Sequence, residues 1–97
     1  MDKSIEQTSL EIVTRVAKEW TPVLKTHACH FGNVELHSSG NGDNYFSEIE
    51  AYIWKGNNVE AVLNLILCLD GKQTMTYEEL EAEANSQIQE IVTKVIS

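Results

Sequence analysis

The sequence predicts an α+β fold, ordered α-β-β-β-α, in which a three-stranded antiparallel meander carries both helices on one face. Three observations indicate this fold: an amphipathic helical pattern at each end of the chain, alternating strand patterns between them, and short turns that join the strands. Strands joined by short turns pair antiparallel with their neighbours. A chain of 97 residues with five Gly and one Pro has no low-complexity linker, so residues 1–97 are expected to form one domain.

The segment from about residue 4 to residue 20 has the pattern of the first helix. Its apolar residues recur near the 3.6-residue helical period and form one face: Ile5, Ile12, Val13, Val16, Ala17 and Trp20. Ser4 and Gln7 have the spacing of a capping box. Pro22 lacks an N–H donor and is expected to end or kink the helix, with Val23 and Leu24 completing the apolar face in a short extra turn.

Three strands are expected at about 29–38, 45–54 and 59–69, separated by a loop at 38–44 and a turn at 55–58, with a further turn at 70–73. In the first strand, Val34 and Leu36 alternate with Glu35 and His37. The second strand has an odd face of Tyr45, Ser47, Ile49, Ala51 and Ile53, and an even face of Phe46, Glu48, Glu50, Tyr52 and Trp54. In the third, the odd positions Val59, Ala61, Leu63, Leu65, Leu67 and Leu69 are expected to be buried, and the even positions to share the other face.

The last helix is expected at about 76–96. Thr76 and Glu79 form a second capping box ahead of an apolar stripe, which consists of Leu80, Ala84, Ile88, Ile91 and Val95. Because each helix has one apolar stripe to cover, both are expected on the same face of the sheet. The opposite face then looks at solvent or at a partner.

Acidic residues dominate the charge, with 15 Asp and Glu against 7 Lys and Arg and a net charge of −8. This balance argues against direct binding of nucleic acid or of an anionic membrane and favours a basic partner. Two cysteines, Cys29 and Cys68, do not make a disulfide framework, and Cys68 lies in an apolar run expected to be buried. With neither a signal-peptide pattern nor an apolar run of about 18 residues, the chain is expected in the cytoplasm.

Catalytic and metal-binding patterns are weak. His27, Cys29 and His30 include the donor types that zinc prefers, but no second ligand pair with structural-site spacing follows. Cys29 with His27, His30 or His37 as its base would need an electropositive pocket, which this acidic chain does not suggest. Paired carboxylates that catalyse acid–base chemistry face each other across a cleft, and no cleft is expected beside Glu48 and Glu50. The stretch Gly40–Gly42 lacks the lysine and the strand-to-helix context of a phosphate-binding loop. We therefore predict no catalytic residue, metal or cofactor, with an enzyme or metalloprotein built on His27, Cys29 and His30 as an alternative.

The stretch "YEELEAEA", residues 77–84, holds four glutamates and no cation. Glu78 and Glu79 suit the first turn of a helix, where the dipole favours negative charge, whereas Glu81 and Glu83 lie beyond it. A second feature is the open sheet face, where Phe46, Tyr52 and Trp54 lie among Glu48, Glu50, Glu60, Val62 and Ile66. Exposed aromatic residues flanked by charge are typical of an interface.

The spacing of these acids has a physical parallel in DNA. Alternate strand residues lie about 6.6 Å apart and helix neighbours about 5–6 Å apart, steps that approximate an array of phosphates. The predicted partner-binding residues are the cluster Asp70, Glu78, Glu79, Glu81 and Glu83, followed by Asp43, Glu48, Glu50 and Glu60, with Tyr52 and Trp54. If the helix and sheet groups point in opposite directions, only one of them makes the contact.

The stretches "KEWTPVLKTHACHFGNVELHSSG", "YIWKGNNVEAVLNLILCLDG" and "YEELEAEANSQ", together with the length and acidity, give the chain a resemblance to a known family. It resembles small phage-encoded anti-CRISPR proteins of the type I-F class, of the kind that mimics double-stranded DNA. The resemblance implies a non-enzymatic inhibitor in the bacterial host cytoplasm. Its partner would be the crRNA-guided surveillance complex, whose basic DNA-binding subunits line the channel for target duplex. The overall pattern carries this resemblance, so it assigns no residue a role.

Two other binding functions are alternatives. An immunity protein that neutralises a basic nuclease toxin would also use charge steering and aromatic anchors. A small acidic secretion chaperone would share the fold class, but such chaperones usually form homodimers, and we expect a monomer here.

Overall fold

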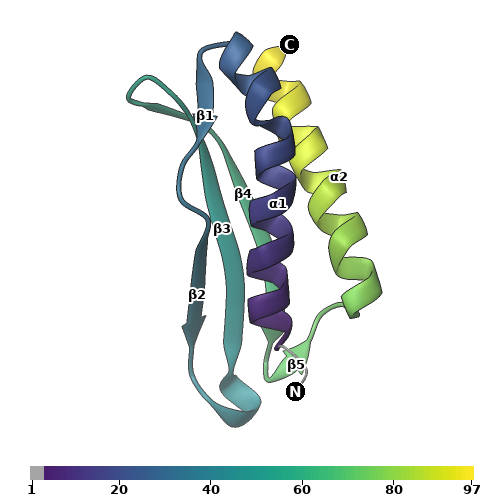
Figure 1. The fold of residues 1–97 in the computed structure, drawn as a ribbon. Coiled ribbons are helices and arrows are strands. Elements are labelled where there is room, and N and C mark those ends of the chain that lie inside the picture. Colours follow the sequence, from purple (N-terminus) through teal and green to yellow (C-terminus); the bar gives the residue numbers. More distant parts are fainter. Residues whose placement is uncertain (1–3) are drawn as a thin grey trace.

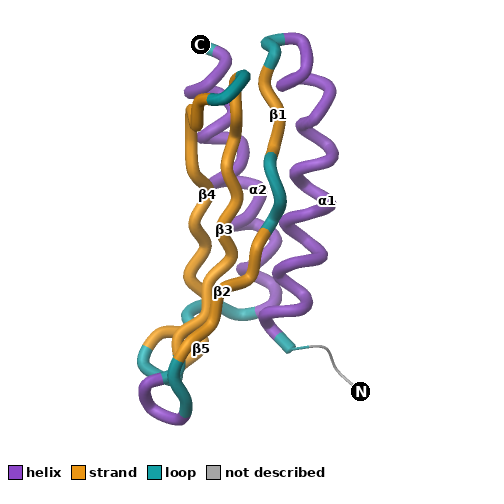
Figure 2. The backbone as a smooth tube through the Cα atoms, turned by 90° about the vertical axis from the view of Figure 1, so that its left-hand side faces the viewer, coloured by secondary structure: helices purple, strands orange, loops and turns teal. Residues whose placement is uncertain are grey.

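The chain folds into two layers, a curled antiparallel sheet and a pair of helices that pack on one of its faces (Figure 1). This computed structural model describes residues 4–97. Seen from the sheet side, both helices lie behind or beside the strands, so the other sheet face is uncovered by them (Figure 2). The predicted α+β class and the helix–strands–helix order are confirmed, but the sheet has five strands where a three-stranded meander was expected.

The first helix, α1 (Ile5–Thr26), is longer than predicted because it continues through Pro22. Ser4 caps its start by accepting a 3.1 Å hydrogen bond from the Gln7 N–H. A proline inside a helix costs about 3 kcal/mol. Leu24, in the turn that follows, is fully buried in the core, and burying a leucine contributes a comparable 1.5–3 kcal/mol or so. The expected extra turn is therefore part of one continuous helix.

The expected strand at 29–38 is divided into β1 (Cys29–Phe31) and β2 (Glu35–Ser39), which both pair with β3 (Phe46–Lys55). Phe31 lies opposite Ile53 and Glu35 opposite Glu50, so residues 32–34 face only residues 51–52. The extra residue cannot join the ladder, and the strand breaks there. Gly32 still donates a 2.8 Å hydrogen bond to the Tyr52 carbonyl, which keeps the break close to β3.

The alternation predicted for β3 is confirmed, and its inner residues Ser47, Ile49, Ala51 and Ile53 are fully buried. Its hairpin partner β4 (Asn58–Leu69) departs from prediction at both ends. The pairing register shifts between Ser47 and Glu48 and again between Ile53 and Trp54. A shift by one residue turns the following side chains to the other face. Val59 and Leu69, expected to be buried, are therefore 45% and 50% exposed, and Cys68 is buried.

Two turns close the sheet at its ends. Gly56 has φ +61° in the two-residue turn between β3 and β4, as a type II′ hairpin requires. Asp70 and Gly71 both have positive φ and turn the chain into β5 (Lys72–Gln73), where only a turn was expected. A short 3₁₀ helix, η1 (Gly42–Asn44), lies against this second turn, and the Gly71 N–H bonds to the Tyr45 carbonyl at 2.9 Å.

The second helix, α2 (Tyr77–Ile96), packs against α1 and β4. Its capping box is confirmed, with Thr76 and Glu79 each bonding to the other's backbone N–H at 3.1 and 2.9 Å. Leu80, Ala84 and Ile88 of the predicted stripe are fully buried, and Val92 is buried as well, while Ile91 and Val95 lie half-buried beside them. The core thus fills the space between the helix pair and the inner sheet face.

Candidate interaction surface

The outer sheet face carries side chains in cross-strand rows. The even-numbered residues of β3 point to this face, because the odd-numbered ones fill the core. Register places Glu35 of β2 opposite Glu50 and His37 opposite Glu48. On the other side of β3, Asn64 lies opposite Glu50 and Ile66 opposite Glu48. Three carboxylates, those of Glu35, Glu48 and Glu50, therefore lie on two neighbouring strands.

Hydrogen bonds and an imidazole link these carboxylates. The His37 Nε2 atom lies 3.4 Å from the Glu35 carboxylate and 3.7 Å from that of Glu50. Asn64 donates a 2.9 Å hydrogen bond to Glu48, and the Tyr52 hydroxyl donates a 2.7 Å hydrogen bond to Glu50. That bond and the negative charge of Glu50 raise the pKa of Tyr52 above its ordinary value. Tyr52 thus remains a neutral donor that fixes the position of Glu50.

Aromatic and apolar side chains continue the same face. The rings of Tyr52 and Trp54 lie 6.2 Å apart and are tilted by 57°. Val62 lies opposite Tyr52, and Val59 lies opposite Trp54, where the register shift has turned it outward. Val59, Val62 and Ile66 are all at least 39% exposed. The face therefore brings Tyr52 and Trp54 together with Glu48 and Glu50, as simple alternation predicted, and adds Val59.

A hollow of about 490 Å³ opens on this face beside the break between β1 and β2. Its lining includes Gly32 and Asn33 from the break, Tyr52 and Trp54 from β3, and the polar side chains His30 and Glu35. Because three residues face two at the break, the backbone leaves the regular pleat here. The hollow is thus a product of the same irregularity that divides the expected strand.

The acids of α2 are partly engaged in local contacts. Glu79 belongs to the capping box, and hydrogen bonds from the Thr76 backbone and side chain lower the pKa of Glu79 below its ordinary value. Glu81 forms an ion pair with Arg15 of α1, and Glu83 accepts a 2.9 Å hydrogen bond from Gln87. Glu78 is exposed at the first turn. A cation for Glu81 thus comes from the neighbouring helix and not from α2.

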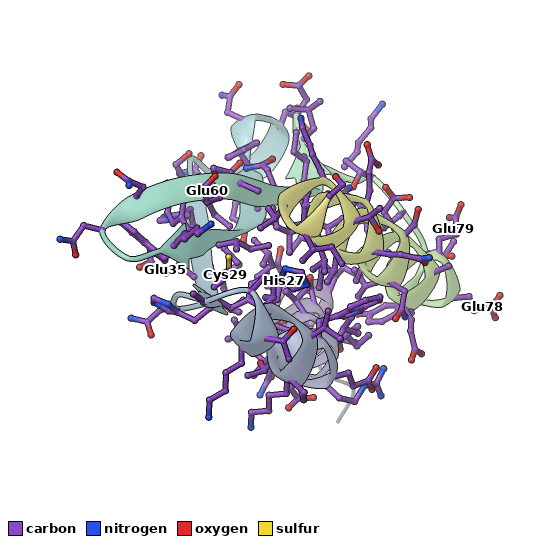
Figure 3. All side chains as sticks on the ribbon, turned by 90° about the horizontal axis from the view of Figure 1, so that it is seen from above. His27, Cys29, Glu35, Glu60, Glu78 and Glu79 are labelled. Carbon is purple, nitrogen blue, oxygen red and sulfur yellow. The ribbon has the colours of Figure 1, made fainter. Side chains whose placement is uncertain are left out.

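The predicted acids do not form one surface. Glu78 and Glu79 lie on the helix side, whereas Glu35 and Glu60 lie at the opposite side (Figure 3). Glu60 is exposed near a register shift of β4 and belongs to no row with Glu48 or Glu50. Asp43 belongs to η1, which lies against the turn formed by Asp70 and Gly71 and not in the rows of the outer sheet face. Of the predicted site residues, Glu48, Glu50, Tyr52 and Trp54 form one group.

The candidate metal and nucleophile residues occupy separate environments. Cys29 is buried, and its thiol donates to the backbone carbonyl of His27 at 3.4 Å. His27 and His30 are both exposed and flank Cys29 in the sequence. Within residues 4–97, no three His, Cys, Asp or Glu side chains come together in a group that could hold a metal ion.

Glu35 is the main site residue that sequence reasoning did not select. Its alternation with Val34 and Leu36 was visible, but its cross-strand partner depends on the register between β2 and β3. That register follows from the irregular break at residues 32–34, which no turn signal marks apart from Gly32 and Asn33. Only the pairing reveals that Glu35 and Glu50 lie side by side.

Comparisons with known proteins identify no relative: no family profile, no curated protein and no solved structure matches this chain. Among residues 4–97, neither helix is long and apolar enough to cross a membrane.

Proposed function

We propose that this protein is a non-enzymatic inhibitor that occupies the basic DNA channel of a CRISPR surveillance complex of the type I-F class and blocks binding of target duplex. The surveillance complex as partner comes from the resemblance of the sequence. The mode of binding is argued from the outer sheet face. The protein would act in the cytoplasm of the bacterial host and would itself bind no nucleic acid.

The observation that carries the proposal is the group of Glu35, Glu48 and Glu50 beside the Tyr52–Trp54 pair. Neighbouring strands lie about 4.8 Å apart and alternate residues about 6.6 Å apart, so these carboxylates stand at regular short steps that approximate an array of phosphates. Lysine-lined channels attract such an array at long range. The aromatic rings and the exposed valines add the apolar contact that gives an interface its affinity.

The sheet face is favoured over α2 as the contact because its acids are combined with anchors. On α2, Glu79 bonds within the cap, Glu81 pairs with Arg15 and Glu83 accepts from Gln87, so three of the four glutamates have local partners. The sheet acids also have local partners, so the neighbouring aromatic pair is what distinguishes the sheet face. The two acidic groups lie on different sides of the molecule (Figure 3). A flat contact with one channel wall can use only one of them.

A competition assay tests the proposal. Purified type I-F surveillance complex is incubated with rising concentrations of the protein, and target duplex binding and co-elution are measured. We expect loss of duplex binding and a stable co-eluting complex. Undiminished duplex binding without co-elution contradicts the proposal, and a basic nuclease toxin then becomes the next partner to test.

Two charge-reversal variants locate the contact. The Glu35→Lys/Glu48→Lys pair changes the sheet face, and the Glu78→Lys/Glu83→Lys pair changes α2 by the same net charge. Neither pair includes the capping residue Glu79, so both should keep the fold, which circular dichroism checks. We expect the sheet pair to weaken inhibition far more than the helix pair. Equal loss in both would indicate that only net charge matters, and a larger loss in the helix pair would move the contact to α2.

A further inference from the structure

We propose that the hollow beside Trp54 is a docking site for a single arginine side chain of a basic partner protein. The hollow has a volume of about 490 Å³, open to the outer sheet face. Tyr52, Trp54 and Glu35 line it, beside a third aromatic residue, Phe31, that packs against the core, and they bring two outward rings and a carboxylate to the same place. None of Tyr52, Trp54 and Glu35 belongs to the hydrophobic core.

Gly32 gives the hollow its shape. A Cβ atom at this position would lie 2.8 Å from Nε1 and 3.2 Å from Cδ1 of Trp54. Real Cβ atoms essentially never approach a side chain so closely, so only glycine lets the indole edge lie against the backbone of the break. The position of Trp54 therefore depends on this residue, which itself bonds to the Tyr52 carbonyl at 2.8 Å.

The lining chemistry selects a planar cation. A guanidinium stacks on the face of Trp or Tyr within about 6 Å of the ring centre and pairs with a carboxylate through a fork of N–H donors. Glu35 supplies a carboxylate at the wall, and Glu50 lies opposite it on β3. Lysine has a compact, strongly hydrated charge and no fork, so it gains less from the same walls. The protein's net charge of −8 further disfavours an anionic occupant.

This inference deepens the proposed function, because the arginine would belong to the basic partner. The hollow rests on its own geometry, however, and its occupant can be tested without any partner protein. If the protein binds arginine but does not block duplex binding in the competition assay, the docking site stands and its basic partner is a different protein. If the protein blocks duplex binding but does not bind arginine, the proposed function stands and the docking site is ruled out.

The test uses the two tryptophans of the sequence, Trp20 and Trp54, as paired reporters. Trp54 lines the hollow, and Trp20 lies on α1, outside it. The ¹⁵N-labelled protein is titrated with arginine amide, with its uncharged isostere citrulline amide, and with lysine amide, and both indole N–H signals are followed. A Trp20→Phe variant assigns the signals. We expect a saturable shift of Trp54 alone with arginine amide, at a Kd of about 1 mM or weaker, and smaller shifts with the other two.

Two variants sharpen the result. Gly32→Ala should displace the ring and abolish the saturable shift, and Glu35→Gln should weaken arginine binding several-fold while Trp54 keeps its place. Glu60→Gln, outside the hollow, is the matched loss of one carboxylate and should leave binding unchanged. Equal shifts of both indoles, equal responses to citrulline amide, or equal responses to lysine amide would each overturn the inference. So would unchanged arginine binding in Glu35→Gln and Gly32→Ala.

Discussion

The Ser47 hydroxyl donates a 2.8 Å hydrogen bond to the Glu6 carboxylate, and this contact joins the first turn of α1 to the inner face of β3. The same carboxylate oxygen accepts from the Tyr45 hydroxyl at 3.3 Å and from the Cys68 thiol at 3.5 Å. Burial acts to raise the pKa of Glu6, but these hydrogen bonds and one from its own backbone outweigh it and lower that pKa below its ordinary value. Burial also raises the pKa of the Cys68 thiol, which keeps it protonated as a donor.

Removing the Ser47 hydroxyl should destabilise the fold. Ser47 is fully buried, and a hydrogen bond to a charged group contributes more than one between neutral groups. We expect Ser47→Ala to lower the free energy of unfolding by about 1–2 kcal/mol, measured by chemical denaturation. Ser38→Ala, at the exposed position opposite Ser47 in β2, is the control and should have little effect. Equal stability of the two variants would contradict a structural role for this bond.

Acid should unfold the protein partly through Glu6. A carboxylate whose folded pKa lies below its unfolded value, about 4.3 for glutamate, stabilises the fold above that value. The contribution disappears as the pH falls through the lowered pKa. We expect Tm to fall between about pH 5 and pH 3, and Glu6→Gln to show a smaller fall. Glu19→Gln, at an exposed position of α1, should keep the full pH dependence.

Ser9 should tolerate loss of its hydroxyl. It is fully buried in α1, and its Oγ has no hydrogen-bond partner within residues 4–97. An unsatisfied buried hydroxyl is unfavourable, and alanine has the higher helix propensity. We expect Ser9→Ala to raise the free energy of unfolding by about 1 kcal/mol. Ser4→Ala removes the cap of the same helix and should instead lower it by about 1 kcal/mol. A loss of stability in Ser9→Ala would mean that its hydroxyl is satisfied.

Two turn glycines should differ in their response to alanine. Both have positive φ, but a Cβ at Gly71 would collide with the Gly42 carbonyl of η1, whereas a Cβ at Gly56 would meet open space. Gly56→Ala should therefore cost about 1–2 kcal/mol from backbone strain alone. Gly71→Ala should cost more, because the loop at 42–45 must also move. Thermal denaturation of both variants checks this order, and equal Tm values would contradict the packing of η1 on the turn.

Binding to the proposed partner should weaken as salt increases. The carboxylates of the sheet face act at long range, and the screening length is about 10 Å at 0.1 M salt. We expect the association rate to fall steeply with ionic strength and the dissociation rate to change less. Surface plasmon resonance at several salt concentrations measures both rates. An association rate that does not respond to salt would mean that the apolar anchors alone drive the contact.

The parts of the fold that local pattern determines could be predicted from sequence. The α2 capping box and the two faces of β3 depend on residues only a few positions apart, and the structure has them as expected. At the start of α1, the structure has only the Ser4 half of the expected box, the bond from the Gln7 N–H. The features that were not predicted depend on distant partners. The break at Gly32 and the outward turn of Val59 follow from cross-strand register, and helix continuation past Pro22 follows from the burial of Leu24.

For the candidate site, too, local pattern could be predicted from sequence and contacts between distant segments could not. Glu48, Glu50, Tyr52 and Trp54 share one face by simple alternation, so sequence could group them. The opposition of Glu35 to Glu50 and the pairing of Glu81 with Arg15 join residues of different elements. Sequence also could not show that η1, which contains Asp43, packs against the turn that contains Asp70.

The inward and outward side chains of β3 have separate roles, so the outward positions of this strand can be varied in protein engineering. Its inward residues hold the helices, while Glu48, Glu50, Tyr52 and Trp54 contribute nothing to the buried core. A library randomised at these four codons would therefore sample recognition surfaces on one unchanging scaffold. Selecting such a library for binding to unrelated target proteins could yield affinity reagents built on this small fold.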